Sequence, residues 1–438
     1  MLPYLLNLVY CVLIALAMPI VIWKRWRTGK YRRGWKEKLF GDLPDLSSHP
    51  RPRVWFHAVS VGEVLQLRQI VERLQRARPE ILPVITTTTE TGYSVARDTF
   101  PACEVTFFPL DFTWSVRRGL RRIAPSAIVL VELELWPNFI LAAARHQIPL
   151  ALINGRLSSR SFRGYSRIRP LVSQLLRCFS LIAVQTDEYR DRFISLGANP
   201  ATTRVTGSIK FDGVATNSDL PKTRELTEWM ELTKGVPVIV AGSTQAPEED
   251  YALRAFRKLK RDDPALRLVL VPRHPERRDE ILQLALRMGF SVRQRSTRQI
   301  HSQFPSSPQI ELLDTVGELG ACWGLATVAF VGGSFGSRGG QNMLEPAAFG
   351  KPVCVGPNTS NFRQIVELLQ SHDAITTVHS AEEMQEFFAK MLRHPEVAAA
   401  QGERAREVVL RQQGATDQTI SLLLECLGEA PAGSQCAA

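Results

Sequence analysis

The sequence offers little that could hold a metal ion or a disulfide framework. Its seven cysteines form no Cys-x-x-Cys pair, and its eight histidines form no His-x-x-x-His or His-Glu-x-x-His pattern. Several cysteines fall in apolar runs, which is typical of reduced thiols in the core of a cytosolic protein. We therefore expect neither a zinc site nor structural disulfides, and no cofactor is indicated.

Charge is absent from the start of the chain. No charged residue occurs from Leu2 to Trp23, a stretch of 22 residues that is long enough to cross about 30 Å of hydrocarbon as a helix. Positive charge follows this stretch, whereas a cleavable signal peptide carries it in front. We therefore expect a membrane anchor over residues 1–23, which either spans the bilayer or, because Pro3, Asn7 and Pro19 weaken a span, lies in its interface.

Acids are almost absent from the segment that follows. Eight basic residues lie between Lys24 and Lys38 against the single acid Glu37, a net charge of +7 that leaves only +4 of the chain's +11 elsewhere. Such a flank stays on the cytoplasmic side and contacts anionic headgroups. We expect a basic collar over 24–45 at an anionic membrane surface, and a nearly neutral body that has no nucleic-acid partner.

The remaining sequence is long enough for two domains. Short apolar runs alternate with amphipathic stretches, as in parallel sheets covered by helices on both faces. A polar patch at 212–219 divides them into two series, which predict Rossmann-like domains over 46–220 and 221–429. The expected strands cover residues 54–59, 83–89, 105–110, 127–133, 150–154, 181–185 and 205–209 in the first series and 236–241, 267–271, 290–293, 310–313, 328–331 and 352–355 in the second.

Helical stretches accompany the second series. One is expected near 225–232, and the last, near 403–427, closes the second domain and is expected to pack back across the pair. The small polar tail 430–438 is expected to be flexible. Two open parallel sheets in tandem predict an α/β fold in which both domains face a cleft, with the ligand outside the carboxyl ends of the strands.

The most specific segment of the second series is glycine-rich. Residues 332–346 contain five glycines within nine positions and follow the expected strand 328–331. Their N–H groups could approach an anion before a helix that begins near Asn342, and Glu345 could accept both hydroxyls of a ribose. The alternative is a turn with a helix-start acid. Because Arg273 and other polar side chains also end strands here, we interpret this domain as a nucleotide binder.

The first series carries acids at its strand ends. Ser60 and Glu63 have the spacing of a capping box, which is a purely structural alternative to a reactive role. Glu132 and Glu134 alternate after another strand, so at least one of them should reach the cleft or a buried partner. If Glu132 approaches Glu63, repulsion would raise one carboxyl pKa toward that of a useful general base.

These segments together resemble the 3-deoxy-D-manno-oct-2-ulosonic acid (Kdo) transferases, membrane-anchored GT-B glycosyltransferases that attach Kdo to the lipid A precursor. The resemblance covers nearly the whole chain. Besides the N-terminal anchor, it rests on Tyr-Arg-Arg-Gly-Trp-Lys-Glu at 31–37, Ser-Val-Gly-Glu at 60–63, Glu-Leu-Glu-Leu-Trp-Pro-Asn at 132–138, Gly-Ser-Ile-Lys-Phe-Asp at 207–212, Pro-Arg-His-Pro-Glu-Arg at 272–277 and the glycine-rich segment 332–346.

The resemblance implies an inverting transfer of Kdo from CMP-Kdo to a lipid A precursor, lipid IVA, at the cytoplasmic face of the cell inner membrane. It implies that Glu63 is the general base and that Glu132 and Lys210 stabilise the transition state. Positions matching the family's CMP-binding segments are Pro272, Arg273, Val316, Gly317, Glu318, Asn342, Met343, Leu344 and Glu345.

The sequence departs from the family pattern at two places on the donor side. Gln341 stands where histidine is usual, and Gln245-Ala246-Pro247 stands where a His-x-Gly is usual. Two other functions stay open: a GT-B enzyme that uses a UDP-sugar and a lipid or glycan acceptor, and a membrane-tethered binder of anionic lipid or nucleic acid without catalysis. The binder would keep its ligand in Glu63→Ala, whereas the transferase would lose transfer.

Overall fold

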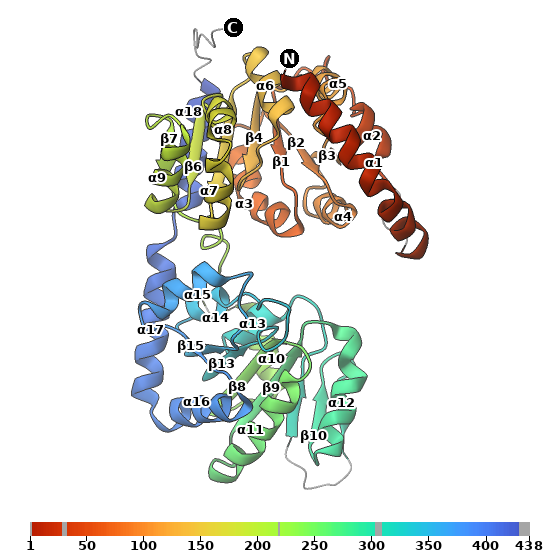
Figure 1. The fold of residues 1–438 in the computed structure, drawn as a ribbon. Helices are drawn as coiled ribbons and strands as arrows, with labels where there is room; N and C mark the ends of the chain where they lie inside the picture. The colour runs from red at the N-terminus through yellow and green to blue at the C-terminus, as the bar shows by residue number, and fades with distance from the viewer. Residues whose placement is uncertain (1, 29–32, 218–219, 303–308, 429–438) are drawn as a thin grey trace. The chain divides into compact units, whose positions relative to one another are not determined.

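The computed structural model describes residues 2–28, 33–217, 220–302 and 309–428. They form two compact units, 1–213 with 413–438 and 214–412. Each unit is built around its own sheet with helices on both faces (Figure 1). The α/β architecture of two parallel-sheet domains expected from the sequence is therefore confirmed.

The first sheet has seven strands in the order β3-β2-β1-β4-β5-β6-β7, and every pairing among them is parallel. The expected strand at 205–209 is wrong in its bounds, because the chain turns away at Gly207, whose φ is 87°. The strands are β1 Arg53–His57, β2 Leu82–Thr87, β3 Glu104–Phe107, β4 Ala127–Val131, β5 Leu150–Gly155, β6 Leu181–Val184 and β7 Thr203–Val205.

The order of this sheet reverses between β1 and β4. Strand β2 lies on one side of β1 and β4 on the other, so the connections after these two strands lead in opposite directions. In open parallel sheets such a switch point leaves a crevice at the carboxyl ends. The segments that begin at Ala58 and Glu132 therefore start at neighbouring places on this edge.

Helices of the first unit cover both faces of its sheet, and two apolar clusters lie beneath them. Packing of the helices' apolar faces against the sheet stabilises them, so the helices need no strong intrinsic helix propensity. The helices are α1 Leu2–Thr28, α2 Trp35–Phe40, α3 Val61–Ala77, α4 Glu90–Thr99, α5 Thr113–Ile123, α6 Pro137–Arg145, α7 Ser159–Ser166, α8 Arg169–Leu176, α9 Asp187–Leu196 and α18 Ala415–Gly428.

The last helical stretch is two helices rather than one. Helix α17 (Pro395–Arg411) ends before Gly414, whose φ of 102° breaks the helix, and α18 follows. The carboxylate of Asp212 accepts hydrogen bonds from the N–H groups of Gly414 (2.6 Å) and Thr416 (2.5 Å). The chain thereby returns α18 to the first unit, whereas the sequence-based boundary at 429 assigned it to the second.

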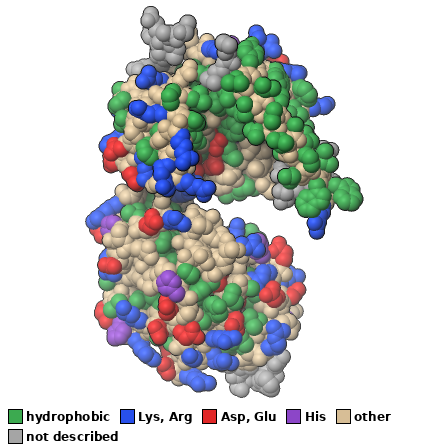
Figure 2. Space-filling model, viewed as in Figure 1, with side chains coloured by type: hydrophobic (Ala, Val, Ile, Leu, Met, Phe, Trp, Pro, Cys, Tyr) green, Lys and Arg blue, Asp and Glu red, His purple; other side chains and the backbone are tan. Residues whose placement is uncertain are grey.

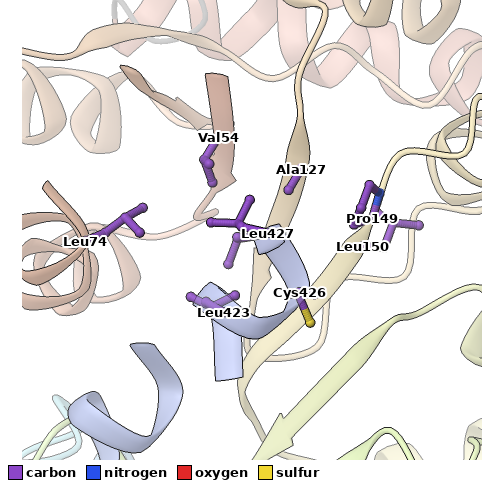
Figure 3. A pocket seen from close by; sticks show the side chains of 10 residues that line it. Val54, Leu74, Ala127, Pro149, Leu150, Leu423, Cys426 and Leu427 are labelled. Carbon is purple, nitrogen blue, oxygen red and sulfur yellow. The ribbon is translucent and has the colours of Figure 1, made fainter. Parts of the chain in front are cut away.

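Helix α18 packs at the amino ends of the strands. Figure 3 shows Leu423 and Leu427 beside Val54 of β1, with Ala127 and Leu150, the first residues of β4 and β5, lining the same pocket. This pocket is apolar and belongs to a core cluster that contains the side chain of Leu423. It stabilises the unit, and it lies at the opposite edge from the strand ends that carry acids.

The second sheet has the order β11-β10-β12-β9-β8-β13-β14-β15, with β11 antiparallel to β10 and the other pairings parallel. The sequence missed β11 and β15, because two residues are too few to show a strand period. The strands are β8 Val238–Thr244, β9 Arg267–Pro272, β10 Ser291–Gln294, β11 Ile300–His301, β12 Gln309–Leu312, β13 Val328–Val331, β14 Val353–Val355 and β15 Thr376–Thr377.

The second unit has its own apolar core between this sheet and its helices. The helix expected near 225–232 begins earlier, because Pro221 occupies its first turn, where its missing N–H costs no hydrogen bond. With α17, the helices of this unit are α10 Pro221–Trp229, α11 Glu248–Asp262, the 3₁₀ turn Pro275–Arg277, α12 Arg278–Arg287, α13 Leu319–Trp323, α14 Leu344–Ala348, α15 Arg363–Gln370 and α16 Ala381–Arg393.

Helix α1 contains the apolar stretch expected as an anchor. Its window Pro3–Ile20 has a mean hydropathy of 2.0, so the helix is long and apolar enough to cross a membrane by length and composition. Of the basic collar, Lys30 and Arg32 lie outside the described residues, as does the tail 430–438. Within the described part, the N–H of Arg33 donates to the Glu90 carboxylate (2.9 Å).

Candidate functional site

Glu63 lies in the first turn of α3, immediately after β1. The Ser60 hydroxyl donates to Glu63 Oε1 (2.7 Å) and accepts from the Glu63 N–H (3.3 Å), and the Val59 N–H donates to Oε2 (2.9 Å). The capping box expected from the sequence is confirmed. It also holds the carboxylate, which is 9% exposed, at the carboxyl end of β1.

The environment of Glu63 favours its protonated form. Burial raises the pKa of its carboxyl group, and the hydrogen bonds from Ser60 and Val59 oppose that rise. The negative charge of Glu132 adds to the rise, as the sequence predicted, but burial contributes more. A carboxyl group with a raised pKa is a better proton acceptor when ionised.

Glu132 begins the segment after β4 in a strained backbone conformation. Its φ of 61° is uncommon for a residue with a side chain, and such strain concentrates at functional sites. The carboxylate forms an ion pair with Arg156 (Nε to Oε2, 2.7 Å) and lies 4.0 Å from the Nζ of Lys210. Burial lowers the pKa of Lys210, and the charge of Glu132 opposes this effect.

Two acids predicted at the end of β4 therefore have different partners. Glu132 faces two cations, whereas burial, followed by the charge of Glu63, raises the pKa of Glu134 to about 7. The ring of Tyr165 is close enough for the Glu134 charge to raise the pKa of its hydroxyl, although burial contributes more. The sequence predicted Glu63, Glu132 and Lys210, and the structure brings these three together with Glu134.

Arg156 and Asn154 were missed by the sequence. Both stand at the end of β5, and strand-end position is the one signal that could have found them. Asn154 is fully buried with a φ of 53°. Its Nδ2 donates to Gln66 Oε1 (2.8 Å), and its Oδ1 accepts from the Ile209 N–H (3.4 Å). It therefore joins the helix that carries Glu63 to the loop that carries Lys210.

The glycine-rich loop of the second unit already holds a carboxylate from its own chain. Glu248, which is 1% exposed, accepts from the N–H groups of Gly333 (2.8 Å), Ser334 (2.8 Å) and Phe335 (3.0 Å), and from Gln245 (2.8 Å). The N–H groups of Gly333, Ser334 and Phe335 are therefore already hydrogen-bonded to the Glu248 side chain. Burial raises the pKa of the Glu248 carboxyl group, and these hydrogen bonds oppose that rise.

The close approach of Glu248 accounts for one glycine. A Cβ at Gly332 would lie 2.6 Å from Glu248 Oε2 and 2.7 Å from the Cα of Thr244. Neither contact leaves room for a side chain, because real Cβ atoms do not come this close to other heavy atoms. Gly332 therefore lets the chain after β13 pass close to both the end of β8 and the Glu248 carboxylate.

The nine positions of the expected CMP site differ in what their side chains do. Glu318 is bound by Arg295 (Nη2 to Oε1, 2.7 Å), which lowers its pKa, and Asn342 donates to Glu345 Oε1 (3.2 Å). Met343 and Leu344 are buried in the unit, whereas Val316 is 85% exposed. Pro272 is the last residue of β9 and Arg273 follows it, whereas Val316, Gly317 and Asn342 lie outside helices and strands.

A polar pocket of about 410 Å³ opens beside the glycine-rich loop. The sequence did not single out the segment after β14 that forms its second wall. The lining residues are Phe335, Gly336, Ser337, Gly339, Pro357, Asn358, Thr359, Ser360 and Arg363.

The two departures from the family pattern meet at one point. A Cβ built on Gly333 would lie 3.1 Å from Gln341 Cγ and 3.4 Å from Gln245 Nε2. The two glutamines, far apart in sequence, therefore border the same glycine. Both positions lie in the second unit, next to the residues that hold the Glu248 carboxylate.

Known proteins are similar along most of the chain. A family profile described as 3-deoxy-D-manno-octulosonic-acid transferase (kdotransferase) matches residues 32–213. The chain is 33% identical over 400 residues to the 3-deoxy-D-manno-octulosonic acid transferase of Haemophilus influenzae, which covers 91% of this chain and 92% of that protein. Identity to the enzyme of the same name from Bordetella pertussis is 34% over 387 residues, covering 86% and 87%.

A solved structure shares the architecture. The chain superposes on the crystal structure of a glycosyltransferase from Rickettsia africae with a TM-score of 0.55 at 13% identity, covering 88% of this chain and 100% of that one. At this identity the likeness shows the fold, and it confirms the GT-B class expected from the sequence. The identity to these relatives, and the share of each chain that the matches cover, establish the family: the chain belongs to the 3-deoxy-D-manno-octulosonic acid (Kdo) transferase family.

Proposed function

We propose that this Kdo transferase moves Kdo from CMP-Kdo to a lipid A precursor, lipid IVA, with inversion, on the cytoplasmic side of the inner membrane. The observation that supports it most is the buried Glu63 carboxylate at the switch point of the first sheet, with Glu132, Lys210 and Arg156 beside it. An acceptor that is a phosphorylated lipid suits a chain with an apolar helix and a basic flank.

Glu63 would act as the general base. A sugar hydroxyl is a poor nucleophile, and a carboxylate that takes its proton while the new bond to the anomeric carbon forms lowers the barrier. The hydrogen bonds from Ser60 and Val59 hold the carboxylate in one orientation. Burial, which raises its pKa, makes it a stronger base than an exposed glutamate.

Glu132, Lys210 and Arg156 would stabilise charge. Kdo carries its own carboxylate and CMP leaves as an anion, so cations held near the reacting atoms offset the negative charge that develops. The Glu132 carboxylate pairs with Arg156 and lies near Lys210, which fixes both cations before substrate arrives. In this proposal Glu132 orients the cations, and Lys210 meets the donor.

The nine CMP positions of the second unit would bind the donor nucleotide chiefly through backbone groups and Arg273. The side chains of Glu318 and Glu345 have protein partners, so we assign contact to the exposed turn at Val316 and Gly317. The guanidinium of Arg273 offers a planar fork for phosphate. The Glu248 carboxylate holds the neighbouring loop in shape for this site.

Turnover with purified protein tests the proposal. The full chain in detergent is incubated with lipid IVA and either CMP-Kdo or UDP-sugars, and the lipid products are weighed by mass spectrometry. We expect the mass of one or more Kdo residues to be added from CMP-Kdo and no product from UDP-sugars. Transfer from a UDP-sugar would favour the alternative GT-B function, and salt-sensitive binding without turnover would favour the non-catalytic binder.

Replacing Asn154 is expected to slow transfer without removing a reacting group. Asn154→Gly keeps the positive φ but loses the bonds to Gln66 and Ile209, which releases the Lys210 loop from α3. Small displacements of positioned groups are costly, so we expect kcat to fall by about tenfold or more. Asn154→Ala adds backbone strain of about 1 kcal/mol and should unfold more easily. Full activity in Asn154→Gly would contradict the positioning role.

Glu134 is expected to make stability depend on pH. Its pKa is raised from 4.5 to about 7, so its ionised form is disfavoured in the folded protein, and stability falls as the pH rises from about 4.5 to about 7. At pH 8, Glu134→Gln should unfold at a higher temperature than the wild type. Its free energy of unfolding should be higher by less than about 3 kcal/mol, because solvent screens the Glu134 charge. The difference should vanish near pH 4, and the exposed control Glu104→Gln should show none.

A further inference from the structure

Helix α1 has two different faces. Leu6, Asn7, Tyr10, Ile14 and Met18 recur every three or four residues, are less exposed than their neighbours, and so form one stripe, the docking face. A second stripe, the outer face, is apolar and exposed, with Leu16 71% accessible; its members are Leu5, Leu8, Val12, Leu16 and Ile20. Figure 1 shows α1 alongside the first unit near α2 and α5, and Figure 2 shows hydrophobic side chains gathered there.

Polar contacts hold the docking face on the first unit. The buried Asn7 side chain donates to Thr113 Oγ1 (2.8 Å) and accepts from the Thr113 N–H (3.1 Å) and from Asn138 Nδ2 (3.2 Å). One turn later, the Tyr10 hydroxyl donates to Asp111 Oδ2 (3.0 Å). Hydrogen-bonding groups of Asn7 are therefore matched by the protein, as buried polar groups must be.

We propose that α1 lies in the plane of the membrane interface as a monotopic anchor, with its outer face in lipid, and does not span the bilayer. From Leu6 to Met18 the docking face runs about 18 Å at 1.5 Å per residue. A spanning helix of a single-pass protein is surrounded by lipid, so crossing along these residues would carry Asp111 and Thr113 into hydrocarbon, where polar groups are costly.

The apolar surface continues beyond α1 onto the first unit. Tyr10 packs edge-on against Phe112 (6.0 Å between ring centroids), and Phe112 stacks on Trp114 (4.5 Å), which is 47% exposed. The indole N–H of Trp114 donates to the carbonyl of Leu39 (2.9 Å), next to the exposed Phe40. Half-exposed aromatic rings of this kind favour the headgroup region of a bilayer.

Charge on the same elements indicates which lipid headgroups fit. Arg27 lies over the Trp23 ring (5.2 Å to the centroid), and Arg117 and Arg121 are exposed on α5. An apolar helix flanked by basic residues binds anionic lipid more tightly than neutral lipid, because the positive charges are attracted to the headgroups. The chemistry therefore points to an anionic leaflet as the occupant of the outer face.

The docking contacts join the anchor to the segment that carries Glu134. Asp111 accepts from the N–H groups of Asn138 (3.0 Å) and Phe139 (2.8 Å), which begin α6 directly after residues 132–136. The anchor would thus hold the carboxyl ends of the strands, where the candidate site lies, at a fixed distance from the lipid. That this distance matters rests on the proposed lipid acceptor, whereas the in-plane position of α1 rests on the contacts alone.

The side of the membrane on which residue 1 lies decides between the two arrangements. The full chain with a cleavable N-terminal tag is expressed in Gram-negative cells, and protease is added to intact spheroplasts or to inside-out membrane vesicles. We expect cleavage only in the inside-out vesicles. Cleavage in intact spheroplasts would place residue 1 across the bilayer and overturn the proposal, as would recovery of the untreated protein in the soluble fraction.

Two variants separate the two faces of α1. Leu8→Asp with Leu16→Asp should lower flotation with vesicles of one part anionic and three parts neutral phospholipid by at least about tenfold, because charge opposes insertion. Asn7→Leu with Tyr10→Phe should keep flotation, yet make α1 itself more susceptible to protease in detergent, because its hydrogen bonds to Thr113, Asn138 and Asp111 are lost. Unchanged flotation of the first variant, or unchanged protection of the second, would contradict the proposal.

Measurements of transfer activity distinguish a failure of the anchor proposal from a failure of the proposed function. The outer-face variant should retain transfer to a detergent-dispersed lipid acceptor, because the side chains of Leu8 and Leu16 are exposed and neither residue is assigned a role in the candidate site. A wild type that floats with vesicles but transfers no Kdo would refute the proposed function and leave the in-plane anchor standing. Active protein whose N-terminus is cleaved in intact spheroplasts would do the reverse.

Discussion

Replacing Glu63 with glutamine is expected to lower kcat for Kdo transfer by about 10²- to 10⁴-fold, the usual contribution of a positioned general base. Glutamine can still cap α3 with Ser60, so stability should fall by less than about 1 kcal/mol. CMP-Kdo binding should be kept, because the proposed nucleotide positions lie in the second unit. Rates are measured by mass spectrometry of the lipid product, and donor binding by calorimetry.

Two comparisons sharpen this result. Glu72→Gln changes a half-exposed acid of the same helix, paired with Arg68 (2.8 Å), and should leave kcat within about threefold of the wild type. Ser60→Ala removes a hydrogen bond that holds the Glu63 pKa down. Because the base must be ionised, activity falls as the pH drops through that pKa, and in Ser60→Ala this fall should move to higher pH. Transfer that survives in Glu63→Gln would refute the base assignment.

The first unit was largely predictable because its strands are buried on both faces. Continuous apolar runs such as 127–131 are typical of strands inside a parallel sheet, and acids directly after them must reach an edge of the sheet. The contacts of Arg156 and Asn154 were not predictable, because they depend on β5 lying next to β4 and on a positive φ at Asn154. Neither strand order nor a single backbone angle leaves a pattern in the sequence.

The glycine-rich loop of the second unit shows the opposite case. Its composition predicts N–H groups that converge on a hydrogen-bond acceptor, but composition does not say which acceptor. The partner, Glu248, precedes the loop by more than eighty positions and stands in a run of three acids that looks like an exposed helix start. Helix α11 carries it inward, and pairing of β8 with β13 brings it beneath the loop.

Loss of the Glu248 carboxylate should strongly destabilise the second unit. Each of its oxygens accepts two backbone N–H groups, and an orphaned buried donor costs about 1 to 3 kcal/mol. Glu248→Gln keeps one oxygen but turns an NH₂ group toward the other two donors. Because these losses are not additive, we expect a destabilisation of about 3 to 5 kcal/mol, comparable to breaking a buried charge network.

The neighbouring Glu249 offers a matched control for this prediction. It is on the same helix and equally buried, but its partner is Arg277, which can keep its second bond to Glu280 (2.8 Å) when Glu249 is replaced by glutamine. Hydrogen exchange at Gly333, Ser334 and Phe335 should therefore speed up by at least about tenfold in Glu248→Gln and much less in Glu249→Gln, since protection follows the free energy of local opening. Equal exchange in the two variants would show that burial alone, and not the four N–H groups, makes Glu248 necessary.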